Sequence, residues 1–460
     1  MTADAFSPVK IIVPCGSLGS GVREEEIEYG LAKGAMAIAS DAGSTDSGAA
    51  YLATGKSKNS RGAVKRDLTI LMKAHAKAGI PVIVGTSGQA GGDLNVNWTR
   101  DILLEVVKEL GISPRIALLY SEQDKAEVKA LNAGGRIKPL PPLGALEDET
   151  VESCDHIVAL MGVEPYIAAL EQGADVILGG RSTDPAVLAS FPIWKGAGWG
   201  AAWHAGKIGE CGVQCSVNPT LGSGVLLTVG RDGFEVEPLS ERNTCTPYSV
   251  SAHMLYENTN PYLLNEPGGQ FDVNNARYEQ EGDGRSVSVT GAAWNPGTYT
   301  MKLEGAGGGR YQTIMLVGIQ DPDVLQDVSG FHDRFLDVLY ARARQTLPPG
   351  EDDDFHISLR MYGWNAVDGA DVPEGTPNPR EIGVLFIATA KTQELANSIA
   401  HACNPYFFHY PAVMNKELPS YGFPFTPADI PRGQVYEFKL NHVVEVEDPL
   451  QLVRTVWVNS

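Results

Sequence analysis

Two short segments of the sequence end in Ser-Thr-Asp shortly after an apolar run. Residues 38–46 read Ile-Ala-Ser-Asp-Ala-Gly-Ser-Thr-Asp, and residues 177–184 read Ile-Leu-Gly-Gly-Arg-Ser-Thr-Asp. Such a run is typical of a buried strand whose carboxyl end leads into a helix N-terminus, the edge at which open α/β proteins bind ligands. Carboxylates at that edge can transfer protons or bind a divalent cation. We therefore predict Asp46 and Asp184 as catalytic residues.

A glycine-rich turn follows the next predicted strand of the same sheet. Residues 85–93 read Gly-Thr-Ser-Gly-Gln-Ala-Gly-Gly-Asp. Glycines let backbone amides approach an anion at a helix N-terminus, so we predict that Ser87, Gly88 and Arg181 bind a substrate anion. Because Ser, Thr and Asp also cap helices, the alternative is that the Ser-Thr-Asp segments only cap the helices that follow them.

The densest cluster of basic residues in this acidic chain lies at residues 56–67. A solvated helix face is the usual explanation of such a cluster. Its place just beyond a predicted ligand edge favours contact between an anionic substrate and Lys56, Lys58 or Arg61. The full set of predicted substrate-binding residues is Ser44, Thr45, Lys56, Arg61, Ser87, Gly88, Gln89, Arg181, Ser182 and Thr183.

Reactive side chains are also concentrated at residues 203–212. In a helix, His204, Lys207 and Cys211 would share one face, and we predict His204 or Lys207 as the catalytic acid that complements the aspartates. The glycines of this segment argue against a regular helix, and a hydrogen-bonded structural histidine is the alternative for His204. Farther along, His253 is predicted to be a core residue satisfied by a neighbour.

Two kinds of metal site are considered. Zinc bound through Cys211, Cys215 and His204 would lack a clear fourth ligand and the usual cysteine pairs. Oxygen ligands are better supplied, and they favour a divalent cation such as Mg²⁺. The candidate oxygen ligands are Asp41, Asp46, Glu122 and Asp184. No motif for NAD, flavin or PLP is found.

Apolar runs alternate with helix-like stretches in the first part of the chain, which predicts an α/β fold with crossover helices between parallel strands. A doubly wound, mostly parallel sheet is the first choice for this half, and a closed barrel is the second. Later alternating runs predict an α+β part with antiparallel strands. We expect an α/β domain at 1–215 with a ligand crevice at the carboxyl ends of its strands, and α+β structure at 216–460, with a subdivision near 320–350. The predicted strands are 10–14, 36–40, 80–85, 115–120, 156–161, 175–179, 224–230, 285–290, 299–303, 312–317 and 355–362, and the longer helices of the second half are 328–346 and 392–403.

Composition narrows the classes of partner. Among 460 residues, 36 Lys and Arg stand against 56 Asp and Glu, a net charge of −20. This charge repels nucleic acids and anionic membrane surfaces, so we expect a small-molecule ligand. The N-terminus has no signal-peptide pattern and the scattered cysteines resemble reduced thiols, which predicts a cytoplasmic protein. We also expect a homo-oligomer.

A set of motifs runs through nearly the whole chain: Ser40-Asp-Ala-Gly-Ser-Thr-Asp46, Arg61-x-x-x-Lys65-Arg66-Asp67, Gly162-Val-Glu164-Pro165, Gly180-Arg-Ser-Thr-Asp184-Pro185, Trp203-His-Ala-Gly-Lys207, Cys245-Thr-Pro247, Phe423-Pro-Phe-Thr-Pro-Ala-Asp429 and Tyr436-Glu-Phe438. In these motifs the sequence resembles the acyclic terpene utilisation (AtuA) family. The family is named for its gene context in the bacterial breakdown of acyclic terpenols. Some relatives carry, or are encoded beside, a small ferredoxin-like domain, so the resemblance implies a small partner subunit.

These observations predict a catabolic enzyme that acts on a small carboxylic acid or acyl thioester by acid/base chemistry, as a hydratase, isomerase or other lyase. Such chemistry needs an anion site, a base, an acid and a polarising group, all of which side chains supply. The alternatives are a non-catalytic subunit that binds an acyl ligand for a partner enzyme, and a hydrolase of phosphate esters or amides.

Overall fold

The computed structural model describes residues 6–347, 354–413, 416–418 and 421–459. The chain forms two compact units, residues 1–307 with 437–460 and residues 308–436. The chain crosses between them within two long strands, β15 (Thr300–Ile319) and β19 (Asp429–Glu445). The division expected at residue 215 falls inside the first unit, because β8 (Val225–Val229) pairs along its length with β1 (Val9–Val13).

A ten-stranded mixed sheet forms the centre of the first unit, in the order β12-β13-β9-β8-β1-β2-β3-β7-β4-β20. Its middle strands are parallel, and the strands on both sides of them are antiparallel. The parallel strands are β1, β2 (Ala37–Asp41), β3 (Val82–Gly85), β7 (Val176–Gly179) and β4 (Arg115–Tyr120). The antiparallel strands are β8, β9 (Gly233–Pro238), β13 (Val287–Thr290), β12 (Arg277–Gln280) and β20 (Arg454–Asn459).

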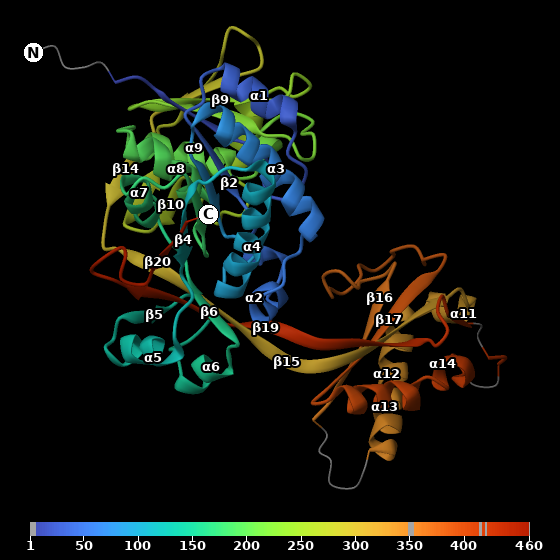
Figure 1. Ribbon diagram of the computed structural model, residues 1–460. Coiled ribbons are helices and arrows are strands. Elements are labelled where there is room, and N and C mark those ends of the chain that lie inside the picture. The colour runs from blue at the N-terminus through green and yellow to red at the C-terminus, as the bar shows by residue number, and fades with distance from the viewer. Residues whose placement is uncertain (1–5, 348–353, 414–415, 419–420, 460) are drawn as a thin grey trace, which may run out of the picture. The chain divides into compact units, whose positions relative to one another are not determined.

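Helices cover both faces of this sheet (Figure 1). Successive side chains of a strand point to opposite faces, so Ile11 packs into one core and Ile12 into the other. The helices of the first face are α7 (Glu164–Glu171), α8 (Asp184–Trp194) and α9 (Trp199–Gly209), and those of the second are α1 (Glu24–Ala32), α3 (Arg61–Ala78) and α4 (Asp93–Leu110). The fold is thus a mixed α/β fold, as predicted at that level.

The finer predictions about the sheet have different outcomes. A closed barrel is wrong, because over the described residues the sheet runs from an edge at β12 to an edge at β20. A doubly wound arrangement stays a prediction. The run at 156–161 does not join the parallel strands: β6 (His156–Ala159) pairs antiparallel with residues 303–306 of β15, a distant partner that no local pattern shows.

The remaining elements of the first unit are short. A three-stranded antiparallel sheet is formed by β10 (Leu263–Glu266), β11 (Gly269–Asp272) and β14 (Ala293–Pro296), and β5 (Ile137–Pro139) pairs with residues 442–444 of β19. The helices are α2 (Ala50–Thr54), α5 (Lys125–Ala133), α6 (Asp148–Ser153) and α10 (Pro247–His253), with 3₁₀ turns η1 (Thr45–Ser47) and η2 (Gly212–Cys215).

The second unit packs helices on an antiparallel sheet, as expected for the later part of the chain. Residues 311–319 of β15 pair with β17 (Ile382–Ala390), and β17 pairs with β16 (His356–Tyr362). The other elements are β18 (Tyr421–Gly422), α11 (Pro322–Gln326), α12 (Val328–Thr346), α13 (Gln393–Cys403) and α14 (Tyr406–His409). Its core is rich in aromatic residues, with Phe335 edge-on to Phe407 at 4.8 Å between ring centres.

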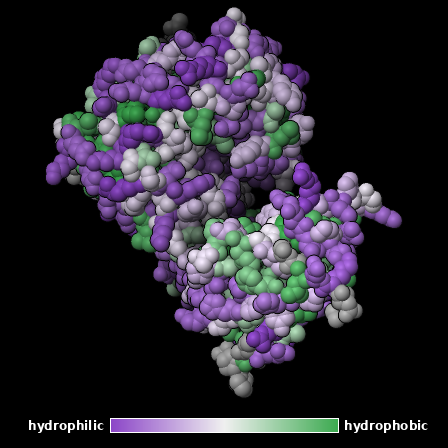
Figure 2. Space-filling view, turned by 90° about the vertical axis from the view of Figure 1, so that its right-hand side faces the viewer, coloured by the Kyte–Doolittle hydropathy of each residue, from purple (hydrophilic) through white to green (hydrophobic). Residues whose placement is uncertain are grey.

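Figure 2 shows hydrophilic residues over much of the surface in view, with hydrophobic patches among them. Within the described residues, none of the helices combines the length and the apolar character needed to cross a membrane.

The loop that follows β1 is fixed by one buried carboxylate. Asp67, in α3, accepts hydrogen bonds from the backbone N–H groups of Gly19 (2.8 Å), Gly21 (3.2 Å) and Val22 (3.1 Å). Gly19 and Gly21 have φ angles of +99° and +120°, which residues with a side chain rarely adopt. The loop therefore depends on both its glycines and this carboxylate.

We expect Asp67→Ala to lower the free energy of unfolding by about 2–4 kcal/mol, because it leaves buried N–H groups without partners. Urea unfolding followed by tryptophan fluorescence measures this change. The matched control is Asp101→Ala, which removes an exposed aspartate that pairs with Arg100 and should cost less than about 1 kcal/mol. Equal losses in the two variants would contradict an anchoring role for Asp67.

Candidate functional site

Three adjoining cavities open in the first unit. The largest, of about 710 Å³, is rich in carboxylates, and we call it the acidic cavity. The strand-end cavity, of about 310 Å³, shares with it Asp46, Asp184, Glu210 and Glu257. The thiol cavity, of about 590 Å³, shares with the strand-end cavity Gly16, Ser17, Ser20, Cys211 and Tyr256.

The two Ser-Thr-Asp segments line the acidic cavity together. Asp46 lies on η1, just after β2, and Asp184 is the first residue of α8, just after β7. Lys207, in α9, and Glu210, which follows that helix, line the same cavity, and Glu266 comes from the end of β10. Five side chains from four parts of the sequence therefore face one space.

The capping alternative holds for Ser44 but not for the two aspartates. Ser44, not Asp46, caps η1, since its hydroxyl accepts the N–H of Asp46 at 3.1 Å. The N-cap of α8 is Thr183, which makes no capping hydrogen bond through its side chain within the described part of the chain. Both aspartates are thus left to face the cavity.

A buried arginine ties the two segments together beneath the cavity. Arg181 is 5% exposed and donates to Glu304 (3.1 Å), Asp184 (3.3 Å), the hydroxyl of Thr45 (3.2 Å) and the carbonyl of Ser182 (3.0 Å). A guanidinium has five N–H groups, and these bonds use four of them. Arg181 therefore binds groups of the protein itself. The sequence pattern had predicted that it would contact a substrate anion.

Glu304 balances the charge of this arginine. The Glu304 carboxylate also accepts the hydroxyl of Thr45 at 3.0 Å and pairs with Lys302 at 2.8 Å. Burial favours the neutral acid, but the positive charges of Arg181 and Lys302 outweigh it and hold the pKa of Glu304 at about 2. Glu304 is consequently an ionised structural partner.

The carboxyl groups that face the acidic cavity behave differently. Burial raises the pKa of Asp184, and the neighbouring charge of Asp46 adds to the rise. Burial raises the pKa of Glu266 to about 8. Burial also raises the pKa of Asp41, which lines the strand-end cavity, and the charge of Asp184 adds to the rise. Glu266 can thus hold a proton near neutral pH, which an acid catalyst requires.

Lys207 is the cation of the acidic cavity. It pairs with Glu210, and burial, which favours the neutral amine, is outweighed by the Glu210 carboxylate, so the pKa of Lys207 is raised. Tyr256 lies over the ammonium group, with 5.9 Å between Nζ and the ring centre. A fixed positive charge therefore faces the same space as Asp184 and Glu266.

Three further residues from the sequence analysis lie on the strand-end cavity. Ser44 and Gln89 line it, and the side-chain amide of Gln89 donates to the carbonyl of Ser44 at 2.9 Å. Lys58 lines it too and donates to the hydroxyl of Ser47 at 3.2 Å. Thr45 lies just beneath, in the arginine network.

The glycine-rich turn predicted to bind a substrate anion lies beside a carboxylate of the protein itself. Ser87 is fully buried, and the described linings of the three cavities include neither Ser87 nor Gly88. At the N-terminus of α4 the N–H of Asp93 donates to the carboxylate of Glu122 at 2.6 Å. The chain's own carboxylate thus takes the amide position that was predicted for a substrate anion.

The same contact removes Glu122 from the candidate metal ligands. Its other oxygen pairs with His156, and it lines a separate cavity. Asp41, Asp46 and Asp184 do line the strand-end cavity together.

The remaining predicted binding residues lie elsewhere. Arg61 pairs with Glu105 on the helix surface, and Lys56 is exposed without lining these three cavities in the described structure. Ser182 is buried against the hydroxyl of Tyr166 at 2.6 Å. The basic cluster is thus mainly a solvated helix face, apart from Lys58.

The glycine-rich segment around His204 forms a regular helix, contrary to expectation. Its glycines allow close packing: a Cβ added at Gly206 would lie 2.5 Å from the carbonyl oxygen of Pro185 in α8. His204 is fully buried, edge-on to Phe234 and 3.2 Å from the hydroxyl of Tyr278. Burial lowers the pKa of His204 to about 3. Its place is structural, and the prediction that His204 could serve as catalytic acid is not supported by this position.

Sequence reasoning gave no role to Glu210, Glu257 or Glu266, although all three line the acidic cavity. Glu210 stands one turn after Lys207, and this i, i+3 spacing is the signal that could have found it. Glu266 ends a strand of the small antiparallel sheet. The expectation that ligands bind at the carboxyl ends of parallel strands therefore could not predict it. Glu257 has a φ of +60°, a strained conformation typical of functional loops.

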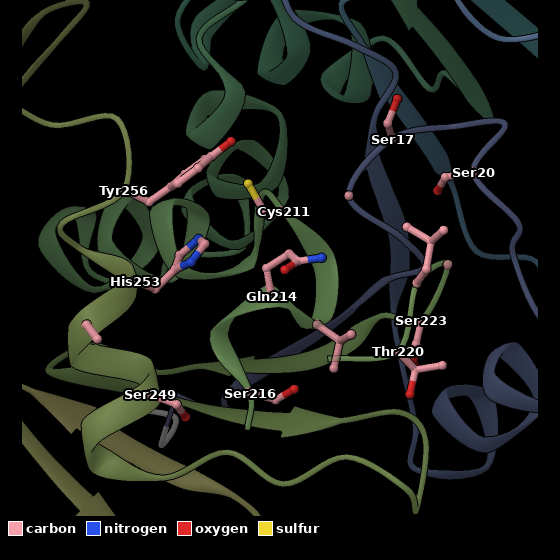
Figure 3. A pocket seen from close by; sticks show the side chains of 15 residues that line it. Ser17, Ser20, Cys211, Gln214, Ser216, Thr220, Ser223, Ser249, His253 and Tyr256 are labelled. Atoms are coloured by element: carbon pink, nitrogen blue, oxygen red, sulfur yellow. The ribbon is translucent and has the colours of Figure 1, made fainter. Parts of the chain in front are cut away.

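His253 also differs from its predicted place. It lines the thiol cavity with Cys211 and Tyr256, as Figure 3 shows. The zinc set of Cys211, Cys215 and His204 is not assembled, because Cys215 is buried against the carbonyl of Gly212 and His204 lies in the core.

Of the comparisons with known proteins, only the one with protein-family models finds a match. No curated protein and no solved structure matches the chain. The family model described as acyclic terpene utilisation family protein AtuA matches residues 30–220 and 233–436, which cover most of the chain and confirm the resemblance drawn from the motifs. The chain belongs to the AtuA family of acyclic terpene utilisation proteins.

Proposed function

We propose that this chain is a catabolic enzyme that acts on an acyl thioester or small carboxylic acid by acid/base chemistry, as a hydratase, isomerase or other lyase. The observation that carries the proposal is the acidic cavity, in which Asp184, Glu266 and Lys207 face one space. These groups supply the three functions that such chemistry needs: a base, a protonated acid and a positive charge.

In this mechanism Asp184, in its ionised form, removes a proton from the carbon next to the substrate carbonyl. The electron pair left on that carbon forms an enolate, whose oxygen gains negative charge, and the Lys207 ammonium stabilises that charge. Glu266 stays protonated at neutral pH because its pKa is raised to about 8. It then donates its proton to carbon, which completes an isomerisation, or to a departing hydroxyl, which completes a dehydration.

The charge of the cavity bears on the form of the substrate. Within the described linings of the acidic and strand-end cavities, the carboxylates outnumber the lysines Lys58 and Lys207. A free carboxylate anion would be repelled there, whereas the reacting end of a thioester is neutral. The family description points to acyclic terpene skeletons, so branched acyl thioesters are the first substrates to test.

Hydrogen exchange with solvent tests the proposal without knowledge of the product. The protein is incubated in D₂O with branched acyl thioesters and the matching free acids, and mass spectrometry follows deuterium entering the carbon next to the carbonyl. We expect the wild-type protein to catalyse this exchange. Asp184→Asn should lower the exchange rate by at least about 100-fold, because a general base usually accelerates a reaction by that factor or more.

The alternatives give other results in this assay. Saturable binding without exchange or conversion, weakened by Asp184→Asn only in proportion to affinity, would overturn catalysis and favour a ligand-binding subunit. Release of phosphate, amine or free thiol without exchange would favour a hydrolase. Circular dichroism of the variant shows whether its fold is kept.

A further inference from the structure

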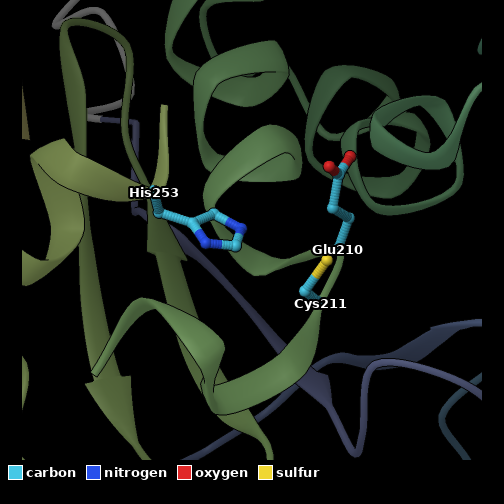
Figure 4. Close-up of side chains that lie close together, drawn as sticks. All are labelled: Glu210, Cys211 and His253. Carbon is cyan, nitrogen blue, oxygen red and sulfur yellow. The ribbon is translucent and has the colours of Figure 1, made fainter. Parts of the chain in front are cut away.

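Three metal-binding side chains converge where the acidic and thiol cavities approach each other. Glu210, Cys211 and His253 each offer one ligand atom, and these atoms lie within 4.8 Å of one another (Figure 4). We propose that these three residues bind a divalent transition-metal ion of the zinc class. The proposal is independent of the proposed acid/base function.

Two of the donor groups have unused atoms. Glu210 is 4% exposed and His253 is 8% exposed. Among the described residues, neither Oε2 of Glu210 nor Nε2 of His253 has a hydrogen-bond partner. Both atoms therefore have lone pairs that are available to a metal ion beside the Cys211 thiol.

The backbone holds the three residues at fixed places. Glu210 and Cys211 follow α9 directly, and the chain then turns at Gly212, which has a φ of +62°. A Cβ on Gly212 would lie 2.7 Å from the backbone nitrogen of Gly16, so the turn is packed against the loop after β1. His253 ends α10, whose first turn is closed by a capping box between Thr246 and Ser249. Ligand atoms around tetrahedral zinc lie roughly 3–4 Å apart, so small side-chain rotations close the site.

The donor types decide which ion fits. Nitrogen, thiolate sulfur and carboxylate oxygen together are ligands of zinc, whereas Mg²⁺ takes oxygen ligands only. In the part of the chain that the structure describes, Asp41, Asp46 and Asp184 do not bring their oxygens equally close. The geometry thus favours the mixed site over the magnesium site considered from the sequence.

Lys207 already pairs with the other carboxylate oxygen of Glu210, Oε1, and the carboxylates around it still leave an excess of negative charge. A dication would offset part of the excess negative charge of the neighbouring acidic cavity. Three protein ligands leave a fourth position of tetrahedral zinc for water or a substrate oxygen, as in catalytic rather than structural zinc sites. The thiol cavity of about 590 Å³ beside Cys211 has room for such a ligand (Figure 3).

Metal titration of the full chain tests the site. Zn²⁺ binding is measured by calorimetry, and Co²⁺ serves as the coloured probe because a thiolate ligand adds a charge-transfer band to its spectrum. We expect one ion per chain and a thiolate band with Co²⁺. Cys211→Ser should abolish the band, and His253→Ala should weaken binding by at least about 100-fold.

The matched control is Gln214→Ala, which changes an exposed residue of the same cavity wall that is not a proposed ligand and should bind Zn²⁺ as the wild type does. Should Cys211→Ser fail to fold, the wild-type Co²⁺ spectrum and the titration of Glu210→Gln decide instead. The proposal is overturned by wild-type protein that binds no ion at one per chain, by a Co²⁺ spectrum without the thiolate band, or by ligand variants that bind as the control does. None of these results depends on turnover. The acid/base proposal is therefore tested separately, by the exchange assay.

Discussion

Glu304→Gln should lower the free energy of unfolding by about 3–5 kcal/mol, the usual cost of breaking a buried ion pair from one side. The substitution keeps the size of the side chain but leaves the guanidinium of Arg181 buried without its full counter-charge. Glu105→Gln is the matched control, because Glu105 pairs with Arg61 on an exposed helix surface and should cost less than about 1 kcal/mol. Urea unfolding of both variants measures the difference.

The pH dependence of stability gives the same prediction a second readout. The folded-state pKa of Glu304 is about 2, below the ordinary value of 4.5 for a glutamate side chain. Its ionised form therefore stabilises the fold above about pH 4.5, and this contribution is lost as the pH falls toward 2. Wild-type protein should lose stability over that interval more steeply than Glu304→Gln. Parallel pH profiles, or equal losses in Glu304→Gln and Glu105→Gln, would show that the ion pair does not hold the two Ser-Thr-Asp segments together.

The strands that carry these segments could be predicted because their signal is local. β4 is found at the predicted residues, and β2 and β7 lie within one or two residues of the predicted bounds. All residues of β2 and β7 are buried, which explains why their apolar runs are continuous instead of alternating. Strand partners that are distant in sequence leave no such signal. The antiparallel pairing of β6 was therefore not predicted, and β15, which is one long strand, was predicted as two separate runs.

The candidate site shows the same limit. Asp46 and Asp184 could be placed from their position after parallel strands, and they do line one cavity. Glu266 and His253 reach the cavities from the small second sheet and from α10, and only the folded chain shows this. A charged residue can also be assigned to the substrate when its partner is distant in sequence. Arg181 follows a strand end, as a substrate-binding residue would, but it forms an ion pair with Glu304, 123 residues later.

Glu266→Gln should lower the rate of the completed isomerisation or dehydration by at least about 100-fold, since an amide cannot donate the proton that a general acid supplies. Wild-type activity should fall as the pH rises through about 8, because Glu266 then loses its proton, and the fall should approach tenfold per pH unit. The residual activity of Glu266→Gln should lack this fall. Glu171→Gln, an exposed substitution at the end of α7, is the control and should keep the wild-type profile. Because the variant removes one ionisable group and leaves the cavity wall otherwise unchanged, a Glu266→Gln profile that still falls at pH 8 would assign the proton to another group.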